Sequence, residues 1–594
     1  MIEKLLTNKT LEAFKTIYNQ EIDSRLITIQ KTRREFDGDL TIVVFPVLRF
    51  SKKSPEDTAS DLGKYLREHL DEVSNFNVIK GFLNLVISDK FWLDFYHQQN
   101  QNPEFGITET KTGKPVVIEY SSPNTNKPLH LGHIRNNLLG CSVSKIVDAN
   151  GKNVVKVNLV NDRGIHICKS MIAWKKWGNG ETPESTGMKG DHLVGKYYVM
   201  FDQQFKKEIK ELVENGMDEE LAEKEASLLM EAQELLRKWE AGNPEVRKLW
   251  TKLNGWVYGG FEETYKHLGV EFDKVFYESD TYLLGRELVF EGVKNGVLFT
   301  KEDGSVWCNL GNEGMDEKLL LRADRTSVYM TQDLGTAQLR KDEYDPEKLL
   351  YVVGNEQNYH FDVLKIILKK LGREWAENIF HLSYGMVELP HGRMKSREGT
   401  VVDADDLMDE MYQTAKKTTE ELGKIDHFSD EEKDQLFKMI SLGALKYYIL
   451  KVDPKKTMLF NPEESIDFNG NTGPFIQYTH ARICSLSRKA KEKGLAIIDN
   501  PSFVELLPKE KDLLKLLFDF PGIINEAGEN YSPALVANYC YDLAKEFNQY
   551  YQEVPILKEE NLNTISSRLQ LSAFVGSVIK TGMDLLGIMV PDRM

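Results

Sequence analysis

The sequence lacks the hallmarks of several protein classes. Its 594 residues include only five cysteines, and no two of them form a Cys-x-x-Cys pair. We therefore expect neither a disulfide framework nor a structural zinc site, and this cysteine usage is typical of the reducing cytoplasm. No run of about 18 apolar residues is present, so no membrane span is expected. The first residues also lack the unbroken apolar stretch of a secretory signal.

The chain also lacks an excess of positive charge, because 92 acidic residues outnumber 76 lysines and arginines. The formal net charge is −16, which argues against a protein that coats nucleic acid without selectivity. A nucleic-acid partner is not excluded, because binding depends on where lysines and arginines cluster. Basic stretches at 31–36, 450–456 and 481–494 are either such clusters or ordinary solvated helix faces.

Hydrophobic patterning divides the chain into three parts. Residues 1–110 combine helical periodicity with short β-rich runs, as in a small α+β domain. Residues 111–405 begin with an apolar strand, a helix and a second strand, which predict a βαβ unit in a parallel sheet. Residues 406–594 are helix-periodic almost throughout, which predicts an α-helical bundle. The sequence therefore predicts a multidomain α/β protein.

The middle part is expected to carry both the sheet and an insertion. A charged, amphipathic helical insertion covers about 178–255 and is interpreted as a mainly solvated element. The expected unit is strand 115–122, helix 132–150 and strand 152–162, with further strands at 305–310, 327–331 and 348–354.

The stretch EYSSPNTNKPLHLGHIRNNLLG, residues 119–140, lies where the first strand passes into the helix. Ligands of a parallel α/β sheet bind beyond the carboxyl ends of its strands. Pro128 restricts the backbone, and Gly132 leaves room for a close approach. His130 and His133 flank this glycine at a helix N-terminus, where they can donate hydrogen bonds to phosphoryl oxygens. The alternative is a turn with two incidental histidines, and the spacing favours the phosphate site.

The same stretch resembles a known enzyme family. HLGH is similar to the His-x-Gly-His signature of class I aminoacyl-tRNA synthetases, and the longer segment resembles arginyl-tRNA synthetases in particular. The resemblance runs through most of the chain. Other stretches that carry it are NLVNDRGIHI, SVYMTQDLGTA, LLYVVGNEQNYHFDVL, FNGNTGPFIQYTHARICSL, ANYCYDLAKEFNQYY and the terminal DLLGIMVPDRM.

The resemblance implies a fold and an activity. The three parts become a tRNA-contacting N-terminal domain (1–110), a Rossmann-type class I catalytic domain (111–405) and a helical anticodon-binding domain (406–594). The implied reaction is ATP-dependent ligation of L-arginine to tRNA(Arg). Arginyl-adenylate forms first, and the arginyl group then passes to the 2′-hydroxyl of the terminal adenosine. Mg²⁺ would accompany the ATP phosphates without a dedicated protein site, and the resemblance implies a cytoplasmic monomer.

The resemblance also assigns residues to the small substrates. Planar carboxylates match the guanidinium fork of arginine. Tyr329 and Asp333 are the implied guanidinium-reading pair, and they share one face if their stretch is helical. The other implied arginine contacts are Glu119, Ser122, Asn124 and Gln357. The implied ATP contacts are Asn124, His130, Gly132 and His133, and the implied catalytic residues are Lys127, His130 and His133.

The second class I signature, Lys-Met-Ser-Lys-Ser, is degenerate in this chain. The corresponding stretch reads HGRMKSREGTVVD (391–403), with Arg393 where the first lysine belongs and Ser396 at the usual fourth position. In arginyl enzymes a lysine just upstream of His-x-Gly-His is thought to take over the phosphate contact, and Lys127 stands there. A flexible point charge can follow moving phosphates, so we favour Lys127. The remaining candidate ATP contacts are Arg393, Met394, Lys395 and Arg397.

Contacts with tRNA are implied in the first and last parts of the chain. Unpaired bases are recognised by stacking on aromatic rings and by polar edges. In KGFLN the implied contacts are Phe82 and Asn84, where some relatives have glutamine in place of Asn84. The implied contacts near the C-terminus are Gln477, Tyr478 and Met594. For Tyr478, the main alternative to a tRNA contact is packing between helices.

Three alternative functions compete with this one. A synthetase for another amino acid is opposed by Tyr329, Asp333 and the degenerate second signature. A small-molecule nucleotidyltransferase would not need the helical bundle over 406–594. A non-catalytic RNA-binding paralogue would have no physical need to retain His130 and His133.

Overall fold

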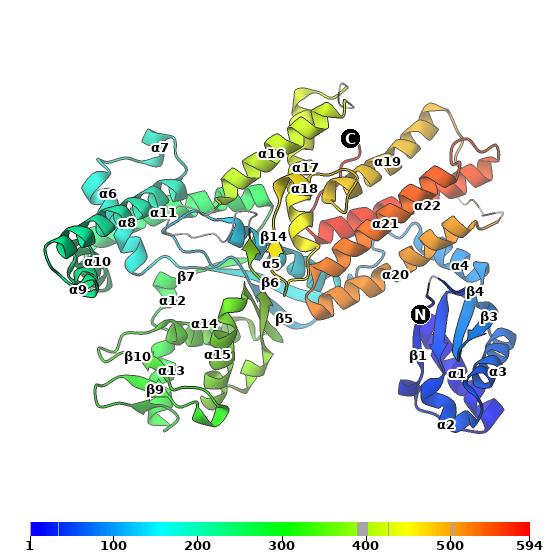
Figure 1. Ribbon diagram of the computed structural model, residues 1–594, viewed down its shortest axis with the longest axis horizontal. Coiled ribbons are helices and arrows are strands. Elements are labelled where there is room, and N and C mark those ends of the chain that lie inside the picture. The colour runs from blue at the N-terminus through cyan, green and yellow to red at the C-terminus, as the bar shows by residue number, and fades with distance from the viewer. Residues whose placement is uncertain are drawn as a thin grey trace. The chain divides into compact units, whose positions relative to one another are not determined.

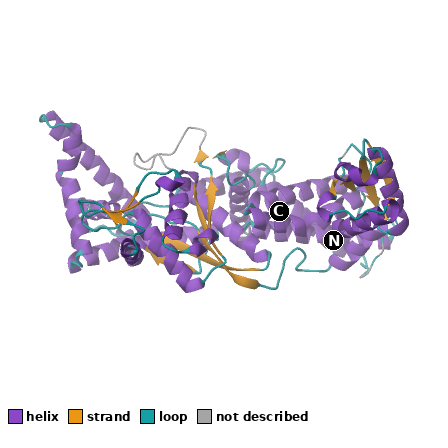
Figure 2. Ribbon diagram, turned by 90° about the horizontal axis from the view of Figure 1, so that it is seen from below, coloured by secondary structure: helices purple, strands orange, loops and turns teal. Residues whose placement is uncertain are grey.

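The computed structural model (Figure 1) describes residues 2–33, 35–388, 402–423, 425, 427–498, 501, 503 and 505–594. Helices predominate over strands (Figure 2), and no helix in the described ranges is long and apolar enough to cross a membrane. Two compact units are distinguished. One comprises Met1–Phe105, Leu486–Asp519 and Glu546–Val575, and the other comprises Gly106–Ser485, Phe520–Lys545 and Gly576–Met594.

The first unit contains a four-stranded antiparallel sheet in the order β1-β2-β4-β3. Strands β3 (Val73–Ile79) and β4 (Phe82–Ile87) form a hairpin. Its two turn residues, Lys80 and Gly81, have φ of 50° and 78°, as a two-residue hairpin turn requires. The neighbouring elements are α1 (Ile2–Tyr18), β1 (Thr28–Lys31), β2 (Leu40–Val43), α2 (Leu48–Ser51), α3 (Pro55–His69) and α4 (Asp89–Gln99).

The second unit is built on a five-stranded parallel sheet in the order β12-β11-β5-β6-β7. The chain passes from β5 through β6 to β7 on one side, and later adds β11 and β12 on the other. A topological switch point therefore lies between β5 and β11, where α/β proteins bind their ligands. The strands are β5 (Thr112–Glu119), β6 (Lys152–Val160), β7 (Lys274–Tyr277), β11 (Lys348–Gly354) and β12 (Ile379–Tyr384).

Helix α5 (Leu131–Ala149) connects β5 to β6, as the sequence predicted. The last four residues of β5 are buried, and the apolar run Val116–Ile118 among them is that of a strand covered on both faces. The predicted helical insertion is present. Residues 178–255 contain α7 (Pro183–Thr186), α8 (Gly190–Glu214), α9 (Glu219–Glu225), α10 (Ser227–Glu240) and the first part of α11 (Pro244–Leu268), and α6 (Ile165–Trp177) precedes them.

Two of the predicted strands differ from the structure. The stretch at 305–310 forms β9 (Val306–Cys308), but β9 belongs to a separate antiparallel sheet with β8 (Phe299–Thr300) and β10 (Lys318–Leu321). The prediction of a strand at 327–331 is wrong, because helix α14 (Tyr329–Tyr344) begins there. Met330, Leu334 and Ala337 are buried at helical spacing, so the longer period outweighs a short β-rich run.

The remaining elements are mostly helical. They include α12 (Glu278–Thr281), α13 (Gly285–Lys294), α15 (Asn358–Lys370) and a two-stranded sheet of β13 (Val387–Glu388) and β14 (Met458–Leu459). The predicted C-terminal helices are present as α16 (Ala404–Glu421), α17 (Asp430–Leu450), α18 (Pro462–Ser465), α19 (Gly473–Glu492), α20 (Pro508–Asn530), α21 (Pro533–Glu553) and α22 (Leu562–Leu585).

Candidate active site

The N-terminus of α5 is capped by two imidazoles. His130 is the N-cap residue, and its Nδ1 accepts the backbone N–H of Gly132 at 3.1 Å. The backbone N–H of His130 donates in turn to Nδ1 of His133 at 3.1 Å. Since both Nδ1 atoms accept hydrogen bonds, the proton of each neutral ring lies on Nε2. Both histidines therefore keep an Nε2–H donor for a ligand.

These two rings are neutral at physiological pH. Burial lowers the pKa of His130 to about 3, with a further contribution from the charge of Lys127. Burial also holds the pKa of His133 well below its usual range, and His130 and Lys127 add to that effect. The ring centroids are 3.9 Å apart. The helix tip therefore combines two uncharged donors with the partial positive charge of a helix N-terminus, an arrangement suited to a phosphate.

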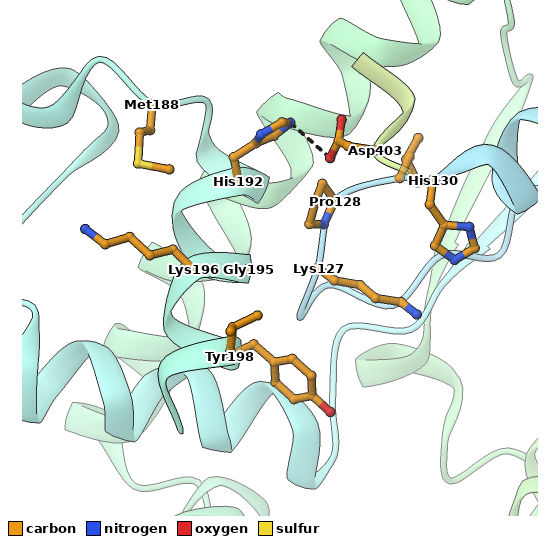
Figure 3. A pocket seen from close by; sticks show the side chains of 11 residues that line it. Lys127, Pro128, His130, Met188, His192, Gly195, Lys196, Tyr198 and Asp403 are labelled. Atoms are coloured by element: carbon orange, nitrogen blue, oxygen red, sulfur yellow. Dashed lines mark ion pairs between the residues drawn. The ribbon is translucent and has the colours of Figure 1, made fainter. Parts of the chain in front are cut away.

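Lys127 supplies a full positive charge beside this tip. Burial lowers the pKa of its ammonium group. Lys127 and His130 both line a cavity of about 220 Å³ (Figure 3). Helix α8 provides the opposite wall with side chains that include His192 and Tyr198. A charge held in such a partly desolvated place interacts more strongly with phosphate than a solvated lysine does.

The carboxyl end of β5 is held in a strained conformation. Ser121 and Ser122 have φ of 78° and 46°, in the left-handed region that non-glycine residues rarely adopt. The backbone N–H of Ser121 donates to Oδ1 of Asn136, and that of Ser122 donates to Oδ1 of Asn158 at 3.0 Å. Strained residues of this kind cluster at functional sites when the surroundings fix them. Asn124, two residues on, is exposed and free to face a ligand.

Asn136 is a positioning residue that the sequence interpretation missed. Its amide N–H₂ group donates to the carbonyl of Val352 at 2.7 Å and to the hydroxyl of Tyr384 at 3.2 Å. One side chain of α5 thus joins the ends of β5, β11 and β12. It stands three residues after His133 in HIRNN, so a helical wheel places both near the same side of the helix.

The predicted guanidinium-reading pair lies in the first two turns of α14. Tyr329 is 75% exposed, and Asp333 follows it by one helical turn. Nε2 of His360 lies 2.5 Å from Oδ2 of Asp333. His360 therefore fixes the carboxylate through one oxygen, and the other oxygen can accept from a ligand. Gln357, at the start of α15, is exposed.

Glu119, an implied arginine contact, is already paired within the protein. It is buried and forms an ion pair with Arg340 of α14, a side chain that is only 1% exposed. The guanidinium group of Arg340 lies 5.4 Å from the ring centroids of both Phe276 and Tyr351. The remaining oxygen of Glu119 accepts from the hydroxyl of Ser122 at 3.1 Å. The protein itself thus supplies the cation for Glu119.

Glu278 is a second acidic residue near Asp333 that the sequence interpretation missed. Burial raises its pKa to about 7, and the negative charges of Asp162 and Asp333 add to the rise. Its carboxylate lies 3.7 Å from the guanidinium group of Arg163. The sequence pattern that could have identified Glu278 is an acidic residue directly after a strand, in VFYESD. A cationic ligand would relieve the crowding of negative charge around Glu278 and Asp333.

Two residues predicted to contact tRNA are buried. Asn84 is 1% exposed, accepts from the hydroxyl of Thr41 at 2.6 Å and donates to Oδ1 of Asn77 at 2.9 Å. Gln477 is 0% exposed and donates to the carbonyls of Met439 and Met589 at 2.9 and 2.8 Å. The Asn84 amide and the N–H₂ group of Gln477 are therefore already used within the protein, and the burial of both side chains argues against the expectation that they face RNA.

The other predicted tRNA contacts are more accessible. Phe82, Tyr478 and Met594 are partly exposed. Phe82 packs edge-on against the exposed ring of Phe45, with centroids 5.4 Å apart. The guanidinium group of Arg482 lies 5.0 Å from the ring of Tyr478. This pair could present both a stacking surface and a positive charge to a base.

Arg393, Met394, Lys395 and Arg397 lie outside the described residues. The residues that follow them run beside the tip of α5. The backbone N–H of Leu131 donates to the carbonyl of Val402 at 3.1 Å, and that of Ala404 donates to the carbonyl of Leu129 at 2.9 Å. The chain that leaves the second signature is therefore tied directly to the first.

Comparisons with known proteins address the fold and the family of the chain. The family model for the catalytic domain of class I tRNA synthetases (R) matches residues 98–461, and the model for the DALR anticodon binding domain matches residues 476–594. The chain is 59% identical to an arginine–tRNA ligase of Bacteroides thetaiotaomicron, with 100% of both chains covered. It is 53% identical to one of Porphyromonas gingivalis, with 99% of both covered.

Solved structures give the same fold. The arginyl-tRNA synthetase of Thermus thermophilus superposes with a TM-score of 0.78 at 23% identity, and 100% of both chains is covered. That of Plasmodium falciparum superposes with a TM-score of 0.77 at 19% identity, covering 100% of this chain and 99% of the other. The predicted fold class, a parallel-sheet catalytic domain with a C-terminal helical domain, is confirmed.

Proposed function

This chain belongs to the arginyl-tRNA synthetases of class I, and from that premise we propose how its residues couple ATP cleavage to the charging of tRNA. The enzyme attaches arginine to tRNA at the expense of ATP. In the first step a carboxylate oxygen of arginine attacks the α-phosphorus of ATP. The new P–O bond gives arginyl-adenylate, and the bond to pyrophosphate breaks.

His130, His133 and Lys127 carry the activation step. The two Nε2–H groups donate to phosphoryl oxygens on which negative charge grows, and Lys127 attracts the phosphates as a point charge. Gly132 belongs to the same contact, because a Cβ there would approach the ring of His130 to 3.0 Å. Asn124 is a further ATP contact. Most of the rate comes from positioning and charge stabilisation, as in other phosphoryl-type transfers.

Asp333 and Tyr329 recognise the guanidinium group of arginine, and Gln357 and Ser122 contact the substrate nearby. Glu278 adds a second carboxylate beside Asp333. Glu119 acts through Arg340 and Ser122, since its own carboxylate is already paired. Loss of one charged hydrogen bond to a guanidinium group costs about 1.5–3 kcal/mol, which is enough to discriminate arginine from a neutral analogue.

In the second step the 2′-hydroxyl of the terminal adenosine attacks the carbonyl carbon of the adenylate, and AMP leaves. Phe82, Tyr478 and Met594 are the proposed tRNA contacts. Mg²⁺ accompanies the ATP phosphates, and we propose no protein ligand for it. The proposed domains are 1–110, 111–405 and 406–594, and the proposed state is a cytoplasmic monomer.

The observation that carries this proposal is the pair of neutral Nε2–H donors at the tip of α5, at the switch point of the parallel sheet. The test is pyrophosphate exchange with each amino acid in turn, with and without tRNA(Arg). We expect that, of the amino acids, only arginine supports exchange. Exchange with lysine at an equal rate would point to a different specificity, and the absence of any exchange with tRNA present would favour a non-catalytic RNA-binding role.

A further inference from the structure

The C-terminal segment, residues 585–594, is held by buried polar side chains from three helices. Alternate carbonyls, from Leu585 at the end of α22 to Pro591, each accept one hydrogen bond from a side chain, so the segment is fixed at four points along its course. The donor and acceptor pairs are Ser142 and Leu585 at 2.9 Å, Lys446 and Gly587 at 2.6 Å, Gln477 and Met589 at 2.8 Å, and His480 and Pro591 at 3.0 Å. All four donor residues are buried.

Helix α19 contributes a third side chain to the end of this segment. Gln477, His480 and Cys484 are spaced by three and four residues, so they lie on one face of the helix. Sγ of Cys484 lies 3.7 Å from Oδ1 of Asp592, the residue that follows Pro591. The same sulfur lies 4.0 Å from Nε2 of His480. An imidazole, a thiol and a carboxylate thus converge at the point where the segment ends.

These separations are close to those within a tetrahedral metal site. Zinc bonds of about 2.3 Å to sulfur and about 2.0–2.2 Å to nitrogen or oxygen place neighbouring ligand atoms about 3.5 Å apart. One ligand atom from each of the three residues lies within 4.8 Å of the others. Cys484 is half-buried and Asp592 is exposed, so small side-chain rotations can close the site and water can reach the fourth position.

The tautomer of His480 also suits a metal ligand. Nδ1 lies 3.0 Å from the carbonyl of Pro591, which can only accept, so Nδ1 carries the proton. Sγ of Cys484 lies 3.8 Å from Nδ1 as well, but a protonated nitrogen cannot bind a cation. Nε2 is left with its lone pair, and a ring fixed through its other nitrogen by a backbone carbonyl is the usual arrangement at metal centres.

We propose that Nε2 of His480, Sγ of Cys484 and Oδ1 of Asp592 form a binding site for a thiophilic divalent cation, best suited to Zn²⁺. On binding, the thiol loses its proton to solvent and the thiolate becomes a ligand. Because two ligands belong to α19 and one to the C-terminal segment, the cation fastens the end of the chain to the helix. The site is separate from the catalytic tip of α5 and does not depend on its role.

The test uses the full-length protein after removal of metals with EDTA, titrated with Co²⁺ as a spectroscopic probe. We expect one equivalent of Co²⁺ to bind with a near-ultraviolet thiolate charge-transfer band, and Zn²⁺ to displace it. Cys484→Ser should abolish the band. Asp592→Asn, at an exposed position, should weaken Co²⁺ binding at least tenfold without affecting folding. Asp584→Asn is the matched control, since Asp584 is also exposed near the C-terminus but pairs with Lys145, and it should bind as the parent does.

A parent protein that shows no charge-transfer band would overturn the proposal. A band that survives in Cys484→Ser would do so as well, because the thiolate would then belong to another cysteine. If Asp592→Asn bound Co²⁺ as tightly as the parent does, Asp592 would not be a ligand, and the proposed link to the C-terminal segment would be wrong. As a second readout, Zn²⁺ should slow the digestion of the last residues by carboxypeptidase in the parent at least threefold, and have no such effect in Asp592→Asn.

Discussion

The backbone N–H of His130 donates to Nδ1 of His133 at 3.1 Å, so one interaction both caps α5 and fixes the tautomer of the His133 imidazole. A helix start of this kind is usually closed by Ser or Thr with Glu or Gln. Imidazoles make the same reciprocal bonds through Nδ1 and keep Nε2–H as a further donor. The residues that cap the N-terminus of the helix can therefore also stabilise charge on a phosphate.

His130→Ser should separate these two roles. Serine is a good N-cap residue, so the helix start is preserved, and we expect the stability to change by no more than about 1 kcal/mol. The Nε2–H donor is lost, and loss of one such donor lowers turnover about 10²–10³-fold. Arginine-dependent pyrophosphate exchange with tRNA measures this effect. Exchange at the parental rate, with the fold intact by circular dichroism, would limit His130 to capping.

Lys127→Ala should slow activation by about an order of magnitude or more, because the phosphates lose a partly desolvated positive charge. Burial lowers the pKa of Lys127, so its charge is lost at a lower pH than that of a solvated lysine. The rate of activation should therefore fall as the pH rises through this lowered pKa. Lys127→Arg remains charged and should extend the alkaline limb of the pH profile. An unchanged turnover number in Lys127→Ala would reject the role.

Asp333→Asn should impair recognition of arginine. The amide cannot offer a charged acceptor to guanidinium, so kcat/KM for arginine should fall about 10–150-fold, equivalent to about 1.5–3 kcal/mol. Asp342→Asn is the matched control, since Asp342 lies on the same helix and accepts from Gln338 at 2.8 Å. If the two variants discriminated arginine from lysine equally well, Asp333 would not be the specificity residue.

Arg340→Met should destabilise the catalytic unit by about 3–5 kcal/mol, because Glu119 would be left buried without its cation. The double variant with Glu119→Gln removes the stranded charge and should recover most of that loss. Thermal denaturation of the parent, both single variants and the double variant gives a complete double-mutant cycle. Additive losses in the double variant would contradict a direct pairing of the two side chains.

Lys446, which donates to a carbonyl of the C-terminal segment, makes the stability of the protein depend on pH. Burial lowers its pKa to about 8 from the usual 10.5 of a lysine. Between these two values the unfolded chain binds more protons than the folded chain, so the Lys446 contribution to stability increases as the pH rises. Relative to Lys446→Met, the parent should gain stability between pH 8 and 10.5 in thermal melts. A difference that stays constant across this range would show that Lys446 is charged in the folded protein throughout.

Much of the site could be predicted from the sequence because its bonds are local. His130, Gly132 and His133 contact one another within a single helical turn, so the His-x-Gly-His spacing already contains their geometry. The strand before them also followed from its unbroken apolar run. The strand expected at 327–331 was wrong because five residues cannot distinguish a β-rich run from the first turn of a helix whose periodicity extends to Tyr344.

The sequence by itself determined the βαβ unit, the capped helix tip with its paired imidazoles, the helical C-terminal part and, through these motifs, the family. Only the tertiary structure decided that Arg340 neutralises Glu119, that Asn84 and Gln477 are buried, and that Asp592 meets His480 and Cys484. The physical reason is the range of the forces involved. Capping and periodicity act over three or four residues, whereas desolvation and ion pairing depend on whichever distant segments the fold brings into contact.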